Sequence, residues 1–184
     1  MPEASVFASG KDFQFLISDG EALVYLDKEG NKLWSGYFKG IRQILYQEIK
    51  NSFLLISPDL VAEFVPGNPI KELYEGSGIT CAANFSKEQK IVIGTSAGYF
   101  FLSESNIIQN VPCSEITDIK EINGQLWFGS VTGAYRLNSD GKYSYYAGER
   151  WLPGNRVTAI ESCPEKSVLV LTDKRLGQIC LKEM

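Results

Sequence analysis

The chain has 184 residues, 44% of them hydrophobic and 22% charged, which is enough for one sizeable core and ordinary for a globular domain. Its formal net charge of -4, without any block of like charges, lacks the basic footprint of a nucleic-acid binder, so nucleic acid is not an expected partner. The 17 glycines and the 12% share of aromatic residues favour a turn-rich all-β protein.

The sequence also disfavours several common classes of protein. No apolar run approaches the roughly 20 residues that a membrane-spanning helix needs, so we expect no membrane insertion. The start of the chain, MPEASVFASG, lacks the regions of a signal peptide, so the protein is either cytoplasmic or has lost an export signal. The chain has no histidine, which disfavours the common zinc sites and histidine-based catalysis. We therefore expect no metal, no cofactor and no catalytic residue.

The cysteines show no CxxC spacing and are interpreted as small buried apolar residues. They are Cys81, Cys113, Cys163 and Cys180.

One pattern recurs along the chain: an apolar run, a small residue, Ser or Thr, a short turn and a second apolar run. In chain order it appears as FQFLISDGEALVYL, FLLISPDLVAEFV, IVIGTSAGYFFL, LWFGSVTGAYRL and VLVLTDKRLGQICL. Steps of 39, 38, 35 and 42 residues separate the equivalent positions, taken as Ile17, Ile56, Gly94, Gly129 and Leu171. A period near forty residues is that of a four-stranded unit.

The fourth unit shows the four strands most clearly. They are predicted at Ile116 to Ile122, Gln125 to Ser130, Ala134 to Leu137 and Lys142 to Tyr146. Asn-Gly and Ser-Asp-Gly lie between strands, and these residues tolerate the left-handed conformations of tight hairpin turns. Each unit is therefore expected to be an antiparallel meander.

Repeated meanders must stack face to face to bury their apolar faces. The sequence thus predicts an all-β fold, a β-propeller of about five four-stranded antiparallel blades. The blades form a small closed ring, part of a larger propeller, or a partial ring completed by a partner. We expect one domain, 1–184, with blade units at roughly 2–38, 41–77, 79–112, 116–148 and 157–184. The fifth unit has sequence for only three strands, and an unpaired blade edge invites self-association or a protein partner.

The stretch NGQLWFGSVTGAYRLNSDGKYSYYAGERWLPGNRVTAI resembles the two-component regulator propeller repeat, whose consensus is roughly "lWiGT..Glyrld..g....y....glp...V.ai". The similarity is good over Ile116 to Ile160 and recognisable over Ile79 to Leu102. The resemblance implies an extracytoplasmic sensor domain of hybrid histidine kinases of Bacteroidota, which often recognise carbohydrate fragments. It also implies a periplasmic or extracellular location, and it transfers no catalytic position.

One connection between units is longer than the others. The loop from Gly148 to Arg156, GERWLPGNR, contrasts with the short connections at Lys39-Gly40, Gly76 to Gly78 and Pro112 to Glu115. In a propeller these connections open on one face, together with hairpin turns such as Asp173 to Arg175. The candidate ligand-binding residues on that face are Glu149, Arg150, Trp151, Asn155, Arg156, Lys174 and Arg175.

An aromatic plane, guanidinium groups and an amide suit a hydroxylated or anionic ligand. The alternative for Trp151, Leu152 and Pro153 is that they cap the core. The sequence therefore predicts a non-enzymatic propeller that binds an oligosaccharide or another small polar ligand. The alternatives are a protein-binding scaffold that uses its rim or unpaired edge, and a propeller hydrolase or lyase.

Overall fold

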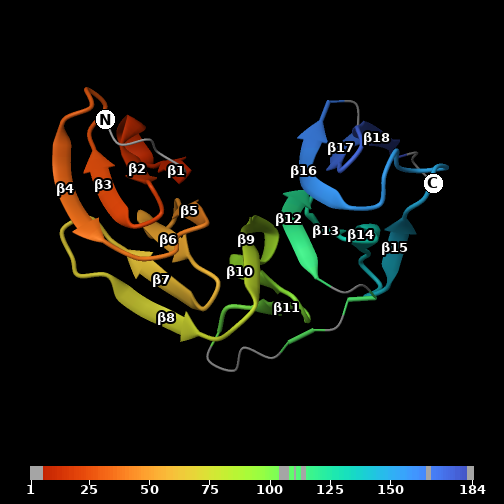
Figure 1. The fold of residues 1–184 in the computed structure, drawn as a ribbon, viewed down its shortest axis with the longest axis horizontal. Helices are drawn as coiled ribbons and strands as arrows, with labels where there is room; N and C mark the ends of the chain where they lie inside the picture. Colours follow the sequence, from red (N-terminus) through yellow and green to blue (C-terminus); the bar gives the residue numbers. More distant parts are fainter. Residues whose placement is uncertain (1–5, 104–107, 110, 113–114, 165–166, 182–184) are drawn as a thin grey trace. The chain divides into compact units, whose positions relative to one another are not determined.

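The computed structural model describes residues 6–103, 108–109, 111–112, 115–164 and 167–181. These residues form eighteen strands and two short 3-10 helices, Lys11–Phe13 and Ser86–Glu88 (Figure 1). The strands belong to five sheets, each built from strands that follow one another in the chain. The chain divides into two compact units, Met1–Ile79 (unit 1) and Thr80–Met184 (unit 2).

Unit 1 contains two four-stranded sheets. The first sheet consists of β1 (Val6–Ser9), β2 (Phe15–Ser18), β3 (Ala22–Leu26) and β4 (Lys32–Tyr37). The second consists of β5 (Gln43–Gln47), β6 (Ser52–Ile56), β7 (Leu60–Phe64) and β8 (Lys71–Glu75). Neighbouring strands pair antiparallel in chain order, as short turns dictate.

Unit 2 carries the remaining three sheets. The third sheet consists of β9 (Ile79–Phe85), β10 (Lys90–Thr95) and β11 (Gly98–Phe101). The fourth consists of β12 (Ile116–Ile122), β13 (Gln125–Ser130), β14 (Gly133–Leu137) and β15 (Tyr143–Tyr146). The fifth consists of β16 (Val157–Cys163), β17 (Ser167–Thr172) and β18 (Leu176–Cys180).

The all-β prediction and the five antiparallel sheets are confirmed, but the prediction of four strands is wrong for the third sheet as far as the structure describes it. In the third sheet, Gln109 alone pairs with Tyr99 at the position of a fourth strand. Among the described residues after β11, Val111 is buried in the core between the third and fourth sheets. The fifth sheet ends at β18, as its shorter sequence predicted. The single domain and the ring remain predictions.

A recurring hydroxyl closes the turn between the second and third strand of the sheets. Ser57 Oγ accepts a hydrogen bond from the Leu60 N–H (3.0 Å) and donates one to the Leu60 carbonyl (3.2 Å). Thr172 Oγ1 makes the same pair of contacts with Arg175 (3.2 and 2.8 Å). The Ser or Thr that marked the repeat is therefore a turn-stabilising residue.

The first sheet keeps the hydroxyl and adds a carboxylate. Ser18 is only 2% exposed, and its Oγ accepts a hydrogen bond from the Gly20 N–H (2.9 Å), as Thr95 and Ser130 accept one from the N–H two residues further on. Asp19 Oδ1 accepts hydrogen bonds from the N–H groups of Glu21 (3.0 Å) and Ala22 (2.8 Å) in the same turn. Both side chains therefore stabilise the turn of the first sheet.

Adjacent sheets of a unit pack face to face. In unit 1 the core between the first and second sheets is built around Leu16, Tyr25, Phe53 and Phe64. In unit 2 one core joins the third and fourth sheets around Tyr99 and Phe128, and another joins the fourth and fifth sheets around Trp127 and Val170. Trp127 and Phe128 are fully buried on opposite faces of β13, as the two-residue period of a strand requires.

The glycine of the repeat lies where two sheets approach most closely. A Cβ built on Gly129 would come within 2.7 Å of Val157 Cγ1 on the next sheet. A Cβ on Gly94 would come within 3.0 Å of Ile116 Cγ2. The glycine therefore serves the stacking of consecutive sheets, which explains why it recurs beside the hydroxyl residue.

The first strands of the fourth and fifth sheets are also joined by hydrogen bonds. Thr117 Oγ1 donates to the Val157 carbonyl (2.8 Å), and Asp118 Oδ2 accepts from the Ile160 N–H (2.6 Å). Both strands carry a bulge next to these contacts, which turns polar groups towards the neighbouring sheet. The two sheets are thus fixed by polar contacts as well as by their core.

Candidate functional site

The long loop from Gly148 to Arg156 has a defined backbone. The Gly148 carbonyl accepts hydrogen bonds from the N–H groups of Trp151 and Leu152, both at 2.9 Å. Asn155 Oδ1 accepts one from the Gly148 N–H (3.1 Å), which ties the two ends of the loop together. Asn155 was predicted as a ligand-binding residue, and in the structure its side chain oxygen is committed to closing the loop.

The second half of the loop packs on the fifth sheet. Leu152 is only 2% exposed and belongs to the core between the fourth and fifth sheets. Pro153 lies over Gly177, where a Cβ would meet Pro153 Cδ at 2.8 Å. The capping interpretation therefore holds for Leu152 and Pro153. It does not hold for Trp151, which is 43% exposed.

Three aromatic rings form a ladder that ends at the exposed tryptophan. Trp127 stacks on Tyr146 with 5.3 Å between ring centroids, and Tyr146 meets Trp151 edge to face at 5.4 Å. A guanidinium group lies against the ring at each end. Arg136 Cζ is 5.8 Å from the Trp127 centroid, and Arg150 Cζ is 5.4 Å from the Trp151 centroid. Rigid aromatic packing therefore orients both arginines.

A cavity of about 570 Å³ lies beside this ladder, between the loop and strand β18. Its lining residues are Arg136, Tyr146, Arg150, Trp151, Gln178, Ile179, Cys180 and Leu181. The cavity combines two aromatic rings, two guanidinium groups and the amide of Gln178. The cavity thus combines apolar surface with a few polar groups, as small-molecule sites generally do.

The predicted candidate residues divide into two groups. Arg150 and Trp151 line the cavity, whereas the other five do not. Arg156 lies 3.9 Å from Glu115 in an ion pair, and its carbonyl accepts a hydrogen bond from the Asp173 N–H (2.8 Å). The side chains of Glu149, Lys174 and Arg175 belong to exposed residues on the loop and the adjacent hairpin.

Arg136 was not predicted and is the main addition to the site. It lies on β14, where its Nε donates to Asn138 Oδ1 (3.0 Å) and its Nη2 to Ser144 Oγ (3.4 Å). The signal was present in the two-residue period. Ala134 pairs with Tyr146, so Arg136 and Tyr146 share a sheet face. Combining that period with the hairpin turn would have placed Arg136 beside the aromatic residues.

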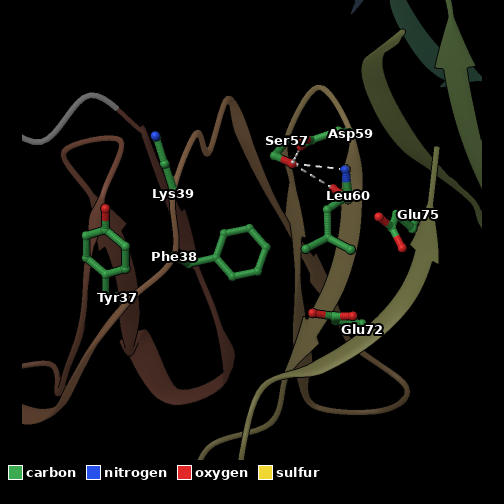
Figure 2. A pocket seen from close by; sticks show the side chains of 8 residues that line it. All are labelled: Tyr37, Phe38, Lys39, Ser57, Asp59, Leu60, Glu72 and Glu75. Atoms are coloured by element: carbon green, nitrogen blue, oxygen red, sulfur yellow. Dashed lines mark hydrogen bonds between the residues drawn. The ribbon is translucent and has the colours of Figure 1, made fainter. Parts of the chain in front are cut away.

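A second cavity, of about 410 Å³, lies in unit 1 between the end of β4 and the second sheet. It is lined by Tyr37, Phe38, Lys39, Ser57, Asp59, Leu60, Glu72 and Glu75. Figure 2 shows Glu72 and Glu75 on β8 on one side, with Phe38 opposite them and the Ser57 to Leu60 turn between. These carboxylates share a surface that their sequence spacing alone did not indicate.

Burial shifts the pKa values of an aspartate and a cysteine in unit 2. Burial raises the pKa of the Asp118 carboxyl, a shift that the hydrogen bonds from Ile160 and Ile119 partly offset. Burial also raises the pKa of the Cys81 thiol to about 12. Cys163 is partly buried and Cys180 is exposed, so the prediction of buried cysteines is wrong for Cys180, which lies on the open edge of its sheet. Cys113 lies outside the described residues.

The described part of the chain contains no group of three or more metal-ligating side chains. None of its helices is long and apolar enough to cross a membrane.

No protein-family model matches this chain, and no curated protein matches it. Solved structures with the same fold do match. The extracellular domain of a one-component system from B. thetaiotaomicron has a TM-score of 0.80 at 13% identity, over 98% of this chain and 28% of that one. The extracellular domain of a hybrid two-component system from B. thetaiotaomicron has a TM-score of 0.75 at 14% identity, over 94% of this chain and 26% of that one.

An enzyme shares the fold as well. Streptogramin B lyase has a TM-score of 0.72 at 12% identity, over 100% of this chain and 70% of that one. At these identities the similarities show the fold, which is propeller-like, and they confirm at that level the resemblance to the two-component regulator propeller. The chain spans about a quarter of the length of the two extracellular domains. Because sensors and an enzyme share this fold, function has to be argued from the site.

Proposed function

We propose that this protein is a non-enzymatic recognition domain of the sensor-propeller type, and that it binds an oligosaccharide in the cavity of unit 2. The observation that carries the proposal is the exposed ring of Trp151. It is held between Tyr146 and Arg150 at the mouth of a cavity of about 570 Å³. An exposed tryptophan with a fixed orientation presents an apolar plane to a ligand at little cost in side-chain entropy.

Sugar chemistry fits the remaining lining residues. A pyranose ring has an apolar C–H face that stacks on an aromatic plane and hydroxyl groups around its edge. Arg136, Arg150 and Gln178 supply donors for those hydroxyls. The volume lies within the range of small-ligand sites, which is roughly 300 to 1,000 Å³. The cavity therefore suits a short oligosaccharide.

The lining also supports binding rather than hydrolysis. Glycoside hydrolysis generally needs a pair of carboxyl groups that flank the scissile bond. None of the residues that line this cavity is acidic. The acidic residues Asp59, Glu72 and Glu75 line the cavity of unit 1 instead.

The comparisons support the sensor part of the proposal. Two of the similar structures are extracellular domains of one-component and two-component systems. By analogy with them, the present chain functions outside the cytoplasm and passes ligand binding to a signalling partner. This part of the proposal rests on fold analogy.

Binding to a panel of neutral and acidic oligosaccharides, measured by thermal shift and titration calorimetry, tests the proposal. We expect at least one ligand to raise the melting temperature, and Trp151→Ala to weaken its binding by roughly tenfold. Tyr145→Ala is the matched control, because Tyr145 is an exposed aromatic residue (50%) that does not line the cavity. Absence of any binding, or equal affinities for the two variants, would refute the site.

A second candidate function is protein binding by strand addition to β18. Among the described residues the fifth sheet ends at this strand. The Thr172 N–H donates to the Arg175 carbonyl, so Thr172 and Arg175 are a hydrogen-bonded pair. Because such pairs alternate in an antiparallel ladder, the backbone groups of Leu176, Gln178 and Cys180 point away from β17. An extended peptide can pair with them.

A proline substitution outside the cavity separates strand addition from sugar binding. Leu176→Pro removes an outward N–H from a residue that does not line the cavity, and it leaves the ladder with β17 intact. We expect it to abolish a complex or oligomer seen by light scattering, if strand addition is the function. A chain that is monomeric at all concentrations and binds only sugars would exclude this candidate.

A further inference from the structure

We propose that the cavity of unit 2 selects an anionic sugar, whose carboxylate or sulfate group is held jointly by Arg136 and Arg150. This inference rests on the proposed function and specifies its ligand class. Both guanidinium groups line the same cavity, and they lie at the two ends of one aromatic ladder. The sugar ring would stack on Trp151 while its acidic group lies between the arginines.

Arg136 is held in position before any ligand binds. Two of its N–H groups donate to Asn138 Oδ1 and Ser144 Oγ, and its planar group packs against the Trp127 ring. A guanidinium group has five N–H donors, so others remain for a ligand. Three contacts that fix the orientation reduce the entropy lost on binding, which favours bidentate recognition of an anion.

The positive charge of the cavity has no acidic counterpart within it. Both partners of Arg136 are neutral side chains, and neither Arg136 nor Arg150 takes part in an ion pair of the described residues. The neighbouring carboxylate on the loop, Glu149, does not line the cavity. The protein as a whole carries a net charge of -4, so this local excess of positive charge runs against the average of the chain.

Charge therefore distinguishes ligands at this site. A neutral sugar gains stacking on Trp151 and hydrogen bonds to its hydroxyls. An acidic sugar adds charge-assisted hydrogen bonds to the arginines, which are about twice as strong as neutral ones. A uronate presents a planar carboxylate that matches a guanidinium fork, whereas a sulfate ester presents three oxygens in a tetrahedral arrangement. Both satisfy the proposal, and they are separable by experiment.

The test is titration calorimetry of the full chain with three trisaccharide probes: a galacturonate trimer, the neutral galactose trimer and a sulfated galactose trimer. We expect an acidic trimer to bind more tightly than the neutral one, and its affinity to fall as salt is raised. Arg136→Gln and Arg150→Gln are each expected to weaken binding of the acidic trimer by roughly 10- to 100-fold. Binding of the neutral trimer should change by less than about threefold. Which acidic trimer binds more tightly identifies the anionic group.

Arg156→Gln is the matched control, because it removes the same charge from an exposed residue outside the cavity. If Arg136→Gln does not fold, Arg136→Lys and Arg150→Gln still test the proposal, since a lysine keeps the charge and loses the fork. Equal affinities for acidic and neutral trimers, or equal effects of the three arginine variants, would overturn the inference. Neutral-sugar binding that depends on Trp151 alone would overturn it and leave the proposed function standing. No sugar binding at all would overturn both.

Discussion

The two cavities lie in different units and their linings carry opposite charge. Each includes the end of a fourth strand or the connection after it, but the cavity of unit 1 lies against the turn between β6 and β7, whereas the cavity of unit 2 lies against the end of β18. In unit 1 the lining holds three carboxylates and one ammonium group, Lys39. In unit 2 it holds two guanidinium groups and no carboxylate. Two sheet-to-sheet junctions of one fold thus offer different binding chemistry.

The difference comes from two local features of the chain. In unit 1 the connection from the first sheet to the second is short, and strand β8 supplies Glu72 and Glu75. In unit 2 the connection is the long Gly148 to Arg156 loop, and β18 is the last described strand of its sheet. The connection between two sheets and the outer strand therefore decide which charged groups line each cavity.

Leu152 anchors the long loop in the core, and its substitution is expected to have the largest effect on stability. Leu152→Ala empties a core position that is 2% exposed and should lower the free energy of unfolding by about 2 to 4 kcal/mol. Trp151→Ala, one residue earlier, should cost less than about 1 kcal/mol because the ring is partly exposed. Urea denaturation measures both. Similar losses for the two variants would show that the loop is not anchored by Leu152.

Much of this fold could be predicted from the sequence because its rules are local. The hairpin turns, the two-residue period and the Ser or Thr of each turn act within a few residues, and the strands of the fourth sheet were predicted to within one residue. Ser18, the marker residue after Ile17, accepts a hydrogen bond from the Gly20 N–H within its own turn (2.9 Å). The marker could therefore be recognised from residue type alone.

The candidate site was harder to predict because it depends on contacts between sheets. The loop's polar residues were expected to act together, but Asn155 closes the loop and Arg156 pairs with Glu115. Arg136 and Cys180 reach the same cavity from strands β14 and β18, far apart in the sequence. No local pattern records which faces of two sheets meet.

Gly154 in the long loop and Gly40 in the short connection between the first and second sheets should respond differently to substitution. A Cβ on Gly154 would lie 2.4 Å from Asp173 Oδ1 and 2.9 Å from Thr172 Oγ1, so Gly154→Ala should cost about 1 to 3 kcal/mol through crowding. A Cβ on Gly40 would make only ordinary contacts, the nearest 3.8 Å from Pro58 Cδ, but Gly40 has a φ of +78°, so Gly40→Ala should cost about 1 to 2 kcal/mol through backbone strain.

Substitution by asparagine distinguishes crowding at Gly154 from backbone strain at Gly40. Asparagine tolerates the left-handed conformation, so Gly40→Asn should recover part of the loss of Gly40→Ala, whereas Gly154→Asn should be worse than Gly154→Ala. Melting temperatures of the four variants provide the measurement. A parallel response at both positions would mean that the long loop and the short connection use glycine for the same reason.

The units should also differ in how pH affects their stability. The pKa of Asp118 is raised by burial, so the stability it contributes is complete below its unfolded pKa of about 3.9 and is lost as the pH rises. Relative to Asp118→Asn, the wild type should therefore become less stable as the pH rises above about 4. Urea midpoints at several pH values measure this trend.

Asp19 provides the opposite case in unit 1. Backbone hydrogen bonds from Glu21 and Ala22 lower its pKa, so its contribution is present above about pH 3.9 and is lost as the pH falls. Asp19→Asn should therefore differ most from the wild type near neutral pH. If both variants shift with pH in the same direction, burial of Asp118 does not control its ionisation.

The reactivity of the native cysteines tests whether a ligand occupies the cavity of unit 2, and it perturbs the fold least because it needs no substitution. Cys180 lies in an exposed position on its lining, whereas Cys81 is buried with its pKa raised to about 12. Because the thiolate is the reactive form, iodoacetamide should alkylate Cys180 in the native protein and Cys81 only after unfolding, as peptide mass spectrometry can measure. A sugar bound in the cavity should slow the reaction of Cys180 and leave that of Cys163, which does not line it, unchanged. An unaltered Cys180 rate at saturating sugar would place the ligand elsewhere, even if Trp151→Ala weakens binding.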